Sequence, residues 1–113
     1  MAILDREHEA GGLGVQLEQE GERVVVRAWG ELDVASSPGF EAELRDAIRT
    51  SSFGVILDLA GVTFIDSTGL RVLISAATLS RSSRRELIVV QGSEQVRQVI
   101  ETSGVEDLLP LVD

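Results

Sequence analysis

The stretch LDLAGVTFIDSTGLRVLISAA, residues 57–77, contains the transition on which the predicted fold depends. Its first part is apolar, which is typical of a strand that is buried on both faces. From Thr68 onward, apolar residues recur every three or four positions, and this spacing predicts an amphipathic helix. Asp66, Ser67 and Thr68, followed by Gly69, lie between the two. We therefore expect a strand, a polar junction and a helix.

The polar junction has two interpretations. Asp66, Ser67 or Thr68 can cap the helix by accepting bonds from its first N–H groups, which stabilises a helix by about 1 kcal/mol. One residue is enough for a cap, whereas three stand here in succession. Gly69 has no side chain, so another molecule could approach the helix start closely. The chemistry of these residues leaves both a cap and an exposed, modifiable hydroxyl open.

The residues before this stretch predict a hairpin and a helix. Alternation over residues 13–17 and a β-branched run over residues 23–30, separated by the turn at 20–22, indicate two antiparallel strands. Ser36 or Ser37 is then expected to start a helix. The apolar face of that helix consists of Phe40, Leu44, Ala47 and Ile48.

The remaining elements predict alternating strands and helices. Strands are expected at 53–59 and 86–91, with connections at 60–66 and 80–85. A last helix should begin at Ser93 and end at Gly104, with Val96, Val99 and Ile100 pointing inward, and residues 105–112 are helical or extended. The order β-β-α-β-α-β-α predicts an α/β fold with a parallel or mixed sheet.

Length and composition favour one globular domain. The chain has 113 residues, and we expect a flexible leader over residues 1–12 followed by a domain at 13–113. The net charge is −9, and all ten basic residues are arginine, so nucleic-acid binding is not expected. The acidic surface either keeps the chain soluble or meets a basic partner. Membrane insertion is not expected either, because no apolar run approaches 20 residues, and the expected location is the cytoplasm.

The residue inventory argues against catalysis. The only histidine is His8, so Ser67 lacks a predicted base, and no lysine is present for phosphate binding or a Schiff base. Asp33, Asp58 and Asp66 could meet at one rim of the sheet, but each has a simpler role in a turn, a strand end or a cap. We therefore predict no catalytic residue, no metal site and no cofactor.

Three segments together resemble the STAS domain family of bacterial anti-sigma factor antagonists. They are GELDVASSPGFEAELRDAI (30–48), VILDLAGVTFIDSTGLRVLISAA (55–77) and ELIVVQGSEQVRQVIETSGVEDLLPLV (86–112). The junction at 66–70, together with the earlier Gly-Glu-Leu-Asp, is the most specific part. The resemblance implies a single STAS-type domain, in which helices pack mainly on one face of a mixed sheet.

The resemblance also implies a function. In that family an anti-sigma factor with serine kinase activity uses ATP to phosphorylate the position of Ser67, and Thr68 is a possible secondary site. The unphosphorylated antagonist binds the anti-sigma factor, which then releases its sigma factor, and a serine phosphatase resets the switch. The chain would thus be a substrate and a binding module, not an enzyme. The residues expected to contact the partner are Asp33, Asp66, Ser67, Thr68, Gly69, Leu70 and Arg71.

Three points stay open. Arg71 stands where many family members have a small residue, so it could pair with Asp66, a phosphate or an acidic partner. A second apolar stripe, Val72, Ala76 and Leu79, either contacts the partner or packs internally. The alternative function is a STAS subunit of a lipid-transport ATPase or stress-signalling assembly, without a phosphorylation cycle. A monomer or weak dimer is expected.

Overall fold

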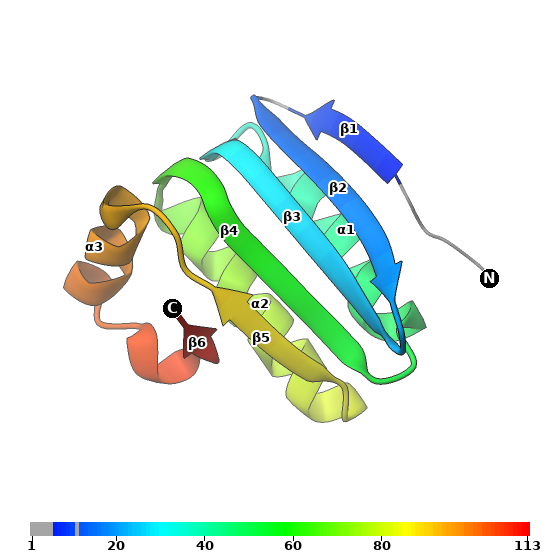
Figure 1. The fold of residues 1–113 in the computed structure, drawn as a ribbon. Coiled ribbons are helices and arrows are strands. Elements are labelled where there is room, and N and C mark those ends of the chain that lie inside the picture. The colour runs from blue at the N-terminus through cyan, green and yellow to red at the C-terminus, as the bar shows by residue number, and fades with distance from the viewer. Residues whose placement is uncertain (1–5, 11) are drawn as a thin grey trace.

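The computed structural model, which describes residues 6–10 and 12–113, contains one six-stranded mixed sheet in the order β1-β2-β3-β4-β5-β6 (Figure 1). β1, β2 and β3 are antiparallel, whereas β3, β4, β5 and β6 are parallel. The strands are β1 (Arg6–Ala10), β2 (Leu13–Glu20), β3 (Arg23–Leu32), β4 (Gly54–Ile65), β5 (Glu86–Val90) and β6 (Leu111–Val112). The helices are α1 (Ser37–Thr50), α2 (Ser67–Ser83), α3 (Glu94–Ser103) and the short 3-10 helix η1 (Glu106–Leu108).

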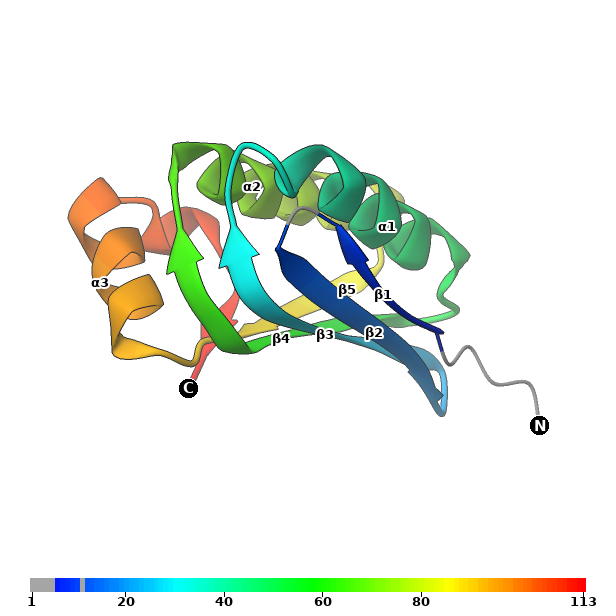
Figure 2. The ribbon, with the colours of Figure 1, turned by 90° about the horizontal axis from the view of Figure 1, so that it is seen from above.

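The two longer helices cover the same face of the sheet. Figure 2 shows α1 and α2 side by side above the strands, and no helix of the described residues covers the opposite face. α3 lies at the side of the sheet and contacts β4. The predicted α/β class, and the packing of helices mainly on one face, are confirmed.

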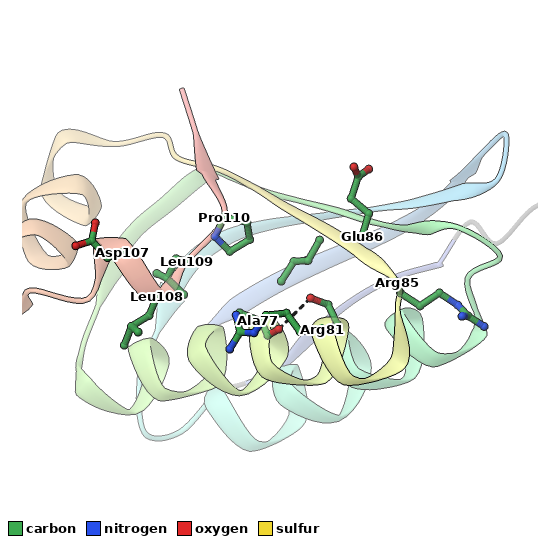
Figure 3. A pocket seen from close by; sticks show the side chains of 10 residues that line it. Ala77, Arg81, Arg85, Glu86, Asp107, Leu108, Leu109 and Pro110 are labelled. Carbon is green, nitrogen blue, oxygen red and sulfur yellow. Dashed lines mark hydrogen bonds between the residues drawn. The ribbon is translucent and has the colours of Figure 1, made fainter.

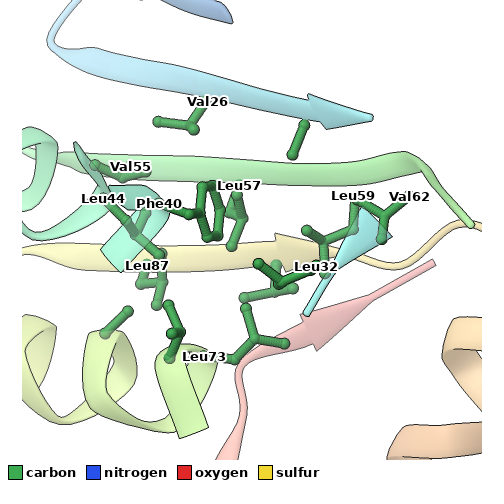
Figure 4. Packing of buried hydrophobic residues seen from close by; sticks show 14 of the residues in the cluster. Val26, Leu32, Phe40, Leu44, Val55, Leu57, Leu59, Val62, Leu73 and Leu87 are labelled. Atoms are coloured by element: carbon green, nitrogen blue, oxygen red, sulfur yellow. The ribbon is translucent and has the colours of Figure 1, made fainter. Parts of the chain in front are cut away.

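The hydrophobic core lies between this helical layer and the sheet. Phe40 and Leu44 of α1 and Leu73 of α2 meet the inward side chains of the strands, among them Val26 and Leu57 (Figure 4). The predicted apolar face of α1 is buried at all four positions. Of the three α3 residues predicted to point inward, Val96 and Ile100 are buried and Val99 is partly buried against the same core. The 3.6-residue pattern therefore identified the inward faces correctly.

The predicted hairpin is also confirmed. β2 and β3 pair from Leu13 with Gly30 to Glu20 with Arg23, and Gly21 in the turn has φ +63°. A positive φ favours glycine, which explains this residue at the tip. The apolar side chains of residues 13, 15 and 17 belong to the core, which places them on the helical side of the sheet.

Three predicted boundaries need correction. β4 continues to Ile65, so most of the expected connection at 60–66 is strand, and α2 continues to Ser83 through most of the expected loop at 80–85. The expected leader contains β1, which pairs with β2, while its residues 1–5 and 11 lie outside the described part of the chain. The closing segment, left open between helical and extended, contains both η1 and β6.

Candidate functional site

Asp66 is the residue that caps α2. Its backbone is extended, with φ −115°, and its Oδ1 atom accepts hydrogen bonds from the N–H groups of Thr68 (2.9 Å) and Gly69 (3.1 Å). The Thr68 hydroxyl donates to the same oxygen. Two of the unpaired N–H groups at the helix start are thereby satisfied.

The same contacts keep the Asp66 carboxyl ionised. The hydrogen bond from the Thr68 hydroxyl is the largest influence and lowers the pKa of Asp66 below its ordinary value. Partial burial opposes this, and the N–H groups of Gly69, Thr68 and Val34 lower the pKa further. Asp66 is therefore a fixed negative charge beside Ser67 at neutral pH.

The two hydroxyls at the junction differ in availability. Thr68 is half-buried, and its Oγ1 atom also lies 3.3 Å from Oγ of Ser37 at the start of α1. Ser67 is exposed, and its side chain makes no hydrogen bond within the described part of the chain. The geometry thus leaves Ser67 as the hydroxyl that another protein can reach.

The turn at Asp33 lies at the same edge of the sheet. Because β3 and β4 are parallel, their carboxyl ends lie together, with Leu32 paired to Ile65 and the Asp66 N–H donating to Leu32 O at 3.2 Å. The Oδ1 atom of Asp33 accepts from the N–H groups of Ala35 (3.0 Å) and Ser36 (3.2 Å). The starts of α1 and α2 therefore form one continuous surface.

Gly69 and Leu70 belong to the interior of this junction rather than to its surface. A Cβ atom on Gly69 would lie 2.7 Å from Ile65 Cγ1 and 2.8 Å from Leu32 Cγ. The missing side chain lets α2 pack on the strand ends, so the expectation that it admits another molecule is wrong. Leu70 is only 7% exposed and belongs to the core. Both residues support the junction from within.

A hollow of about 240 Å³ separates the first turns of α1 and α2, next to the junction. Its lining combines apolar, hydroxyl and charged side chains: Val34, Ser37, Pro38, Glu41, Thr68, Arg71 and Val72. Val34 is 70% exposed, and Phe64, near the end of β4, is 48% exposed. Neither residue was expected at the site from the sequence. An apolar residue in the polar turn after Asp33 is the signal that could have revealed Val34.

The second apolar stripe of α2 packs internally. Val72 is 4% exposed and Ala76 is 1% exposed, and α2 lies against α1. Leu79 is partly buried against the same core. Of the two interpretations left open, internal packing is correct for Val72 and Ala76, and Leu79 packs partly against the same core.

A larger hollow, of about 390 Å³, lies away from this junction (Figure 3). It is formed by the C-terminal half of α2, by β5 and by the η1–β6 segment, and its charged lining includes Arg81, Arg85, Glu86 and Asp107. Charges of both signs line it, and it contains none of the sequence-predicted site residues. Size alone therefore does not identify the functional surface.

The three aspartates considered for a metal do not form one group. Oδ1 of Asp58 accepts from the N–H of Ala60 at 2.9 Å, while Asp33 and Asp66 each cap a helix start or turn. Over residues 12–113, whose side chains the structure describes, no group of three or more side chains could hold a metal ion. Among the same residues, no helix is both long and apolar enough to cross a bilayer.

Comparison with known proteins gives one consistent result. A family model described as "STAS domain" matches residues 14–113. BtrV of Bordetella bronchiseptica, named as a candidate anti-sigma factor antagonist, is 32% identical over 84 residues, which are 74% of this chain and 72% of BtrV. The anti-sigma F factor antagonist of Paenibacillus polymyxa is 29% identical over 104 residues, covering 89% of each chain.

A solved relative matches in two chemical forms. The unphosphorylated form of the anti-sigma factor antagonist SpoIIAA has a TM-score of 0.71 at 26% identity, with 88% of each chain covered. The phosphorylated form of the Bacillus protein has a TM-score of 0.65 at 25% identity, covering 88% of this chain and 91% of that one.

Proposed function

The chain belongs to the STAS domain family, and from this premise we propose that it is a bacterial anti-sigma factor antagonist switched by phosphorylation of Ser67. In the unphosphorylated form it binds an anti-sigma factor in the cytoplasm, and a sigma factor is released. The chain is the substrate and the binding module in this scheme, and the kinase activity belongs to the partner.

The observation that carries the proposal is the exposure of the Ser67 hydroxyl. Its neighbour Thr68 donates to Asp66, whereas Ser67 makes no side-chain hydrogen bond among the described residues. Relatives named as anti-sigma factor antagonists, and a relative solved with and without phosphate, support the same assignment. Thr68 is the weaker candidate for modification, because its hydroxyl is already used.

The proposed cycle consists of two phosphoryl transfers. The anti-sigma factor moves the γ-phosphoryl group of ATP to Oγ of Ser67, which loses its proton, and ADP is released. A serine phosphatase then transfers the group to water and releases inorganic phosphate. Each cycle leaves the antagonist chain chemically unchanged.

The phosphate acts on the complex rather than on the fold. It adds roughly −1.5 to −2 charges at neutral pH, beside the existing charge of Asp66. An exposed position at a helix start tolerates this charge, whereas a partner surface fitted to a small hydroxyl does not. A differential cost of about 3–4 kcal/mol would weaken binding a few hundredfold.

The proposed partner surface surrounds Ser67. It includes the turn at Asp33, the exposed Val34, and Asp66, Thr68 and Arg71 beside the hollow between α1 and α2. Exposed Phe64 extends it on the β4 side. This surface combines apolar area with a few charges, as protein interfaces do. Gly69 and Leu70 shape it without contributing contacts.

The test uses anti-sigma kinases from the same genome. We expect ATP to place one phosphate on Ser67, detected by mass spectrometry, and binding measured by calorimetry to fall at least a hundredfold on phosphorylation. Ser67→Asp should weaken binding, and Ser67→Ala should bind but resist modification.

Ser52→Asp is the matched control, because Ser52 is an exposed serine in the loop before β4, at the opposite end of that strand. It should bind as the unmodified chain does. Equal binding by Ser67→Asp and Ser52→Asp, with no phosphate on Ser67, would contradict the proposal. Stable copurification with transporter or sensor subunits, unaffected by Ser67→Ala, would instead support the non-cycling STAS subunit.

A further inference from the structure

Arg71 is an exposed cation with no partner in the part of the chain that the structure describes. It lines the hollow between α1 and α2 together with Glu41, but no ion pair joins the two side chains. The Oδ1 atom of Asp66 accepts the bonds of the α2 cap, and no ion pair joins this carboxylate to Arg71. The guanidinium group is therefore free to bind an anion that arrives later.

Helix geometry places Arg71 beside Ser67. The two residues are four positions apart in α2, so their Cβ atoms are about 5–6 Å apart on one face. Side chains of a helix lean toward its N-terminus, and the long side chain of Arg71 therefore extends over the turn that contains Ser67. An anion on residue i and a cation on residue i+4 is the favourable order.

Three N–H groups at the start of α2 already have acceptors, which leaves a side-chain cation as the strongest partner for a phosphate on Ser67. The N–H groups of Thr68 and Gly69 already donate to the Asp66 side chain, and that of Leu70 donates to its carbonyl at 3.0 Å. These groups of the helix start are not available to a new anion. The neighbouring charged groups are carboxylates: Asp66 on the same helix, Asp33 in the adjacent turn and Glu41 on α1.

We propose that the guanidinium group of Arg71 binds the phosphate of phosphorylated Ser67 and fixes the position of that phosphate. The inference rests on the proposed phosphorylation of Ser67. A guanidinium group presents several N–H donors in a fixed plane and bonds phosphate oxygens in pairs. Phosphorylation then has two effects on the partner surface. It adds an anion, and it engages the Arg71 cation, which would otherwise face the partner.

The test measures the second pKa of the phosphate without any partner protein. Phosphoserine is installed at position 67 during translation with a suppressor tRNA, and the phosphate is titrated by phosphorus NMR at low salt. The ordinary value is about 6. We expect the second pKa of the phosphate to be about half a unit higher in Arg71→Gln than in the phosphorylated protein that keeps Arg71. This is about a threefold change in proton affinity.

Two variants make the result specific. Arg71→Lys keeps the charge but loses the planar donors, so the phosphate pKa of this variant should lie between those of the protein that keeps Arg71 and of Arg71→Gln. Arg81→Gln removes an arginine of the same helix at its far end, about 15 Å further along the axis, and should leave the titration unchanged. The effect of Arg71→Gln should shrink in about 1 M salt, where the Debye length is about 3 Å.

The proposal would be overturned if the phosphate had the same pKa in Arg71→Gln as in the protein that keeps Arg71. It would also be overturned if Arg81→Gln shifted that pKa as much as Arg71→Gln does. Circular dichroism of each variant confirms that the fold is retained. Because the phosphoserine is encoded, this measurement does not depend on a kinase. If no kinase modifies Ser67 while the NMR shift is present, the proposed function fails and the binding role of Arg71 stands.

Discussion

At the scale of single residues, the adjacent polar side chains of the β4–α2 junction have different roles. Asp66 caps the helix, Thr68 holds the Asp66 carboxylate, and Ser67 is left exposed. Because Asp66 alone satisfies two N–H groups, Ser67 is not needed for the helix. A change at Ser67 can therefore alter recognition without removing the cap.

Asp66→Asn tests the charge of the cap. The pKa of Asp66 is lowered in the folded chain, chiefly by Thr68, so the ionised form stabilises the fold. This contribution is complete above the unfolded pKa of about 3.9 and is lost as the pH falls through the lower, folded pKa. We expect Asp66→Asn to lower the free energy of unfolding by about 0.3–1 kcal/mol at pH 7, and by less below pH 4.

Urea unfolding at pH 7, 4 and 3 measures this difference. Asp46→Asn is the matched control, since it removes an exposed carboxylate of α1 and leaves the α2 cap intact. A loss in Asp66→Asn that stays constant across the three pH values would show that the charge of the cap does not stabilise the fold.

At the scale of elements, the periodic segments could be predicted from sequence, and the irregular ones could not. The inward faces of α1 and α3 followed from the spacing of their apolar residues. β4 was predicted too short because β5 pairs only with Gly54–Asp58, so the rest of β4 loses its second neighbour. Its exposed positions, such as Thr63 and Phe64, then interrupt the apolar run that marks a central strand.

In the candidate site, too, some features could be predicted from sequence and others could not. Its location at the 66–71 junction was predictable, because capping residues follow an apolar strand. The inward direction of Gly69 and the burial of Val72 were not, since both depend on how closely α2 approaches β3 and α1. Such distances arise from tertiary packing, which a pattern of residue types does not contain.

Arg84→Gly tests the end of α2. Arg84 has φ 55°, a left-handed conformation that costs a non-glycine residue roughly 1–2 kcal/mol. Glycine adopts it without that cost but loses more entropy on folding, so we expect a net gain of about 1 kcal/mol in the free energy of unfolding. Urea unfolding of the variant and the starting chain measures the change.

Gly104 provides the reciprocal control at the end of α3. It has φ 71°, and apart from its neighbours in the chain no atom lies within 4 Å of the position a Cβ would take, so a substitution there changes the backbone preference without a clash. Gly104→Ala should lower the free energy of unfolding by about 1 kcal/mol. If neither substitution changes stability, the left-handed helix ends are not under strain.

At the scale of the whole molecule, the fold separates stability from recognition. The core lies between the sheet and the layer of α1 and α2, whereas Ser67 lies at the exposed start of α2. The proposed switch requires this separation, because a phosphate that unfolded the chain would end the cycle rather than reset it. The monomer must therefore tolerate a negative charge at residue 67.

Ser67→Asp tests that tolerance in the isolated chain. The helix start favours the new carboxylate and Asp66 repels it, so we expect the free energy of unfolding to change by less than about 0.5 kcal/mol. Phe40→Ala, which empties a core position that is 1% exposed, should instead cost about 3–5 kcal/mol. Urea unfolding followed by the fluorescence of Trp29, the only tryptophan, measures both variants. A loss above about 1 kcal/mol in Ser67→Asp would mean that the charge acts by destabilising the antagonist itself, and the docking surface would no longer explain the switch.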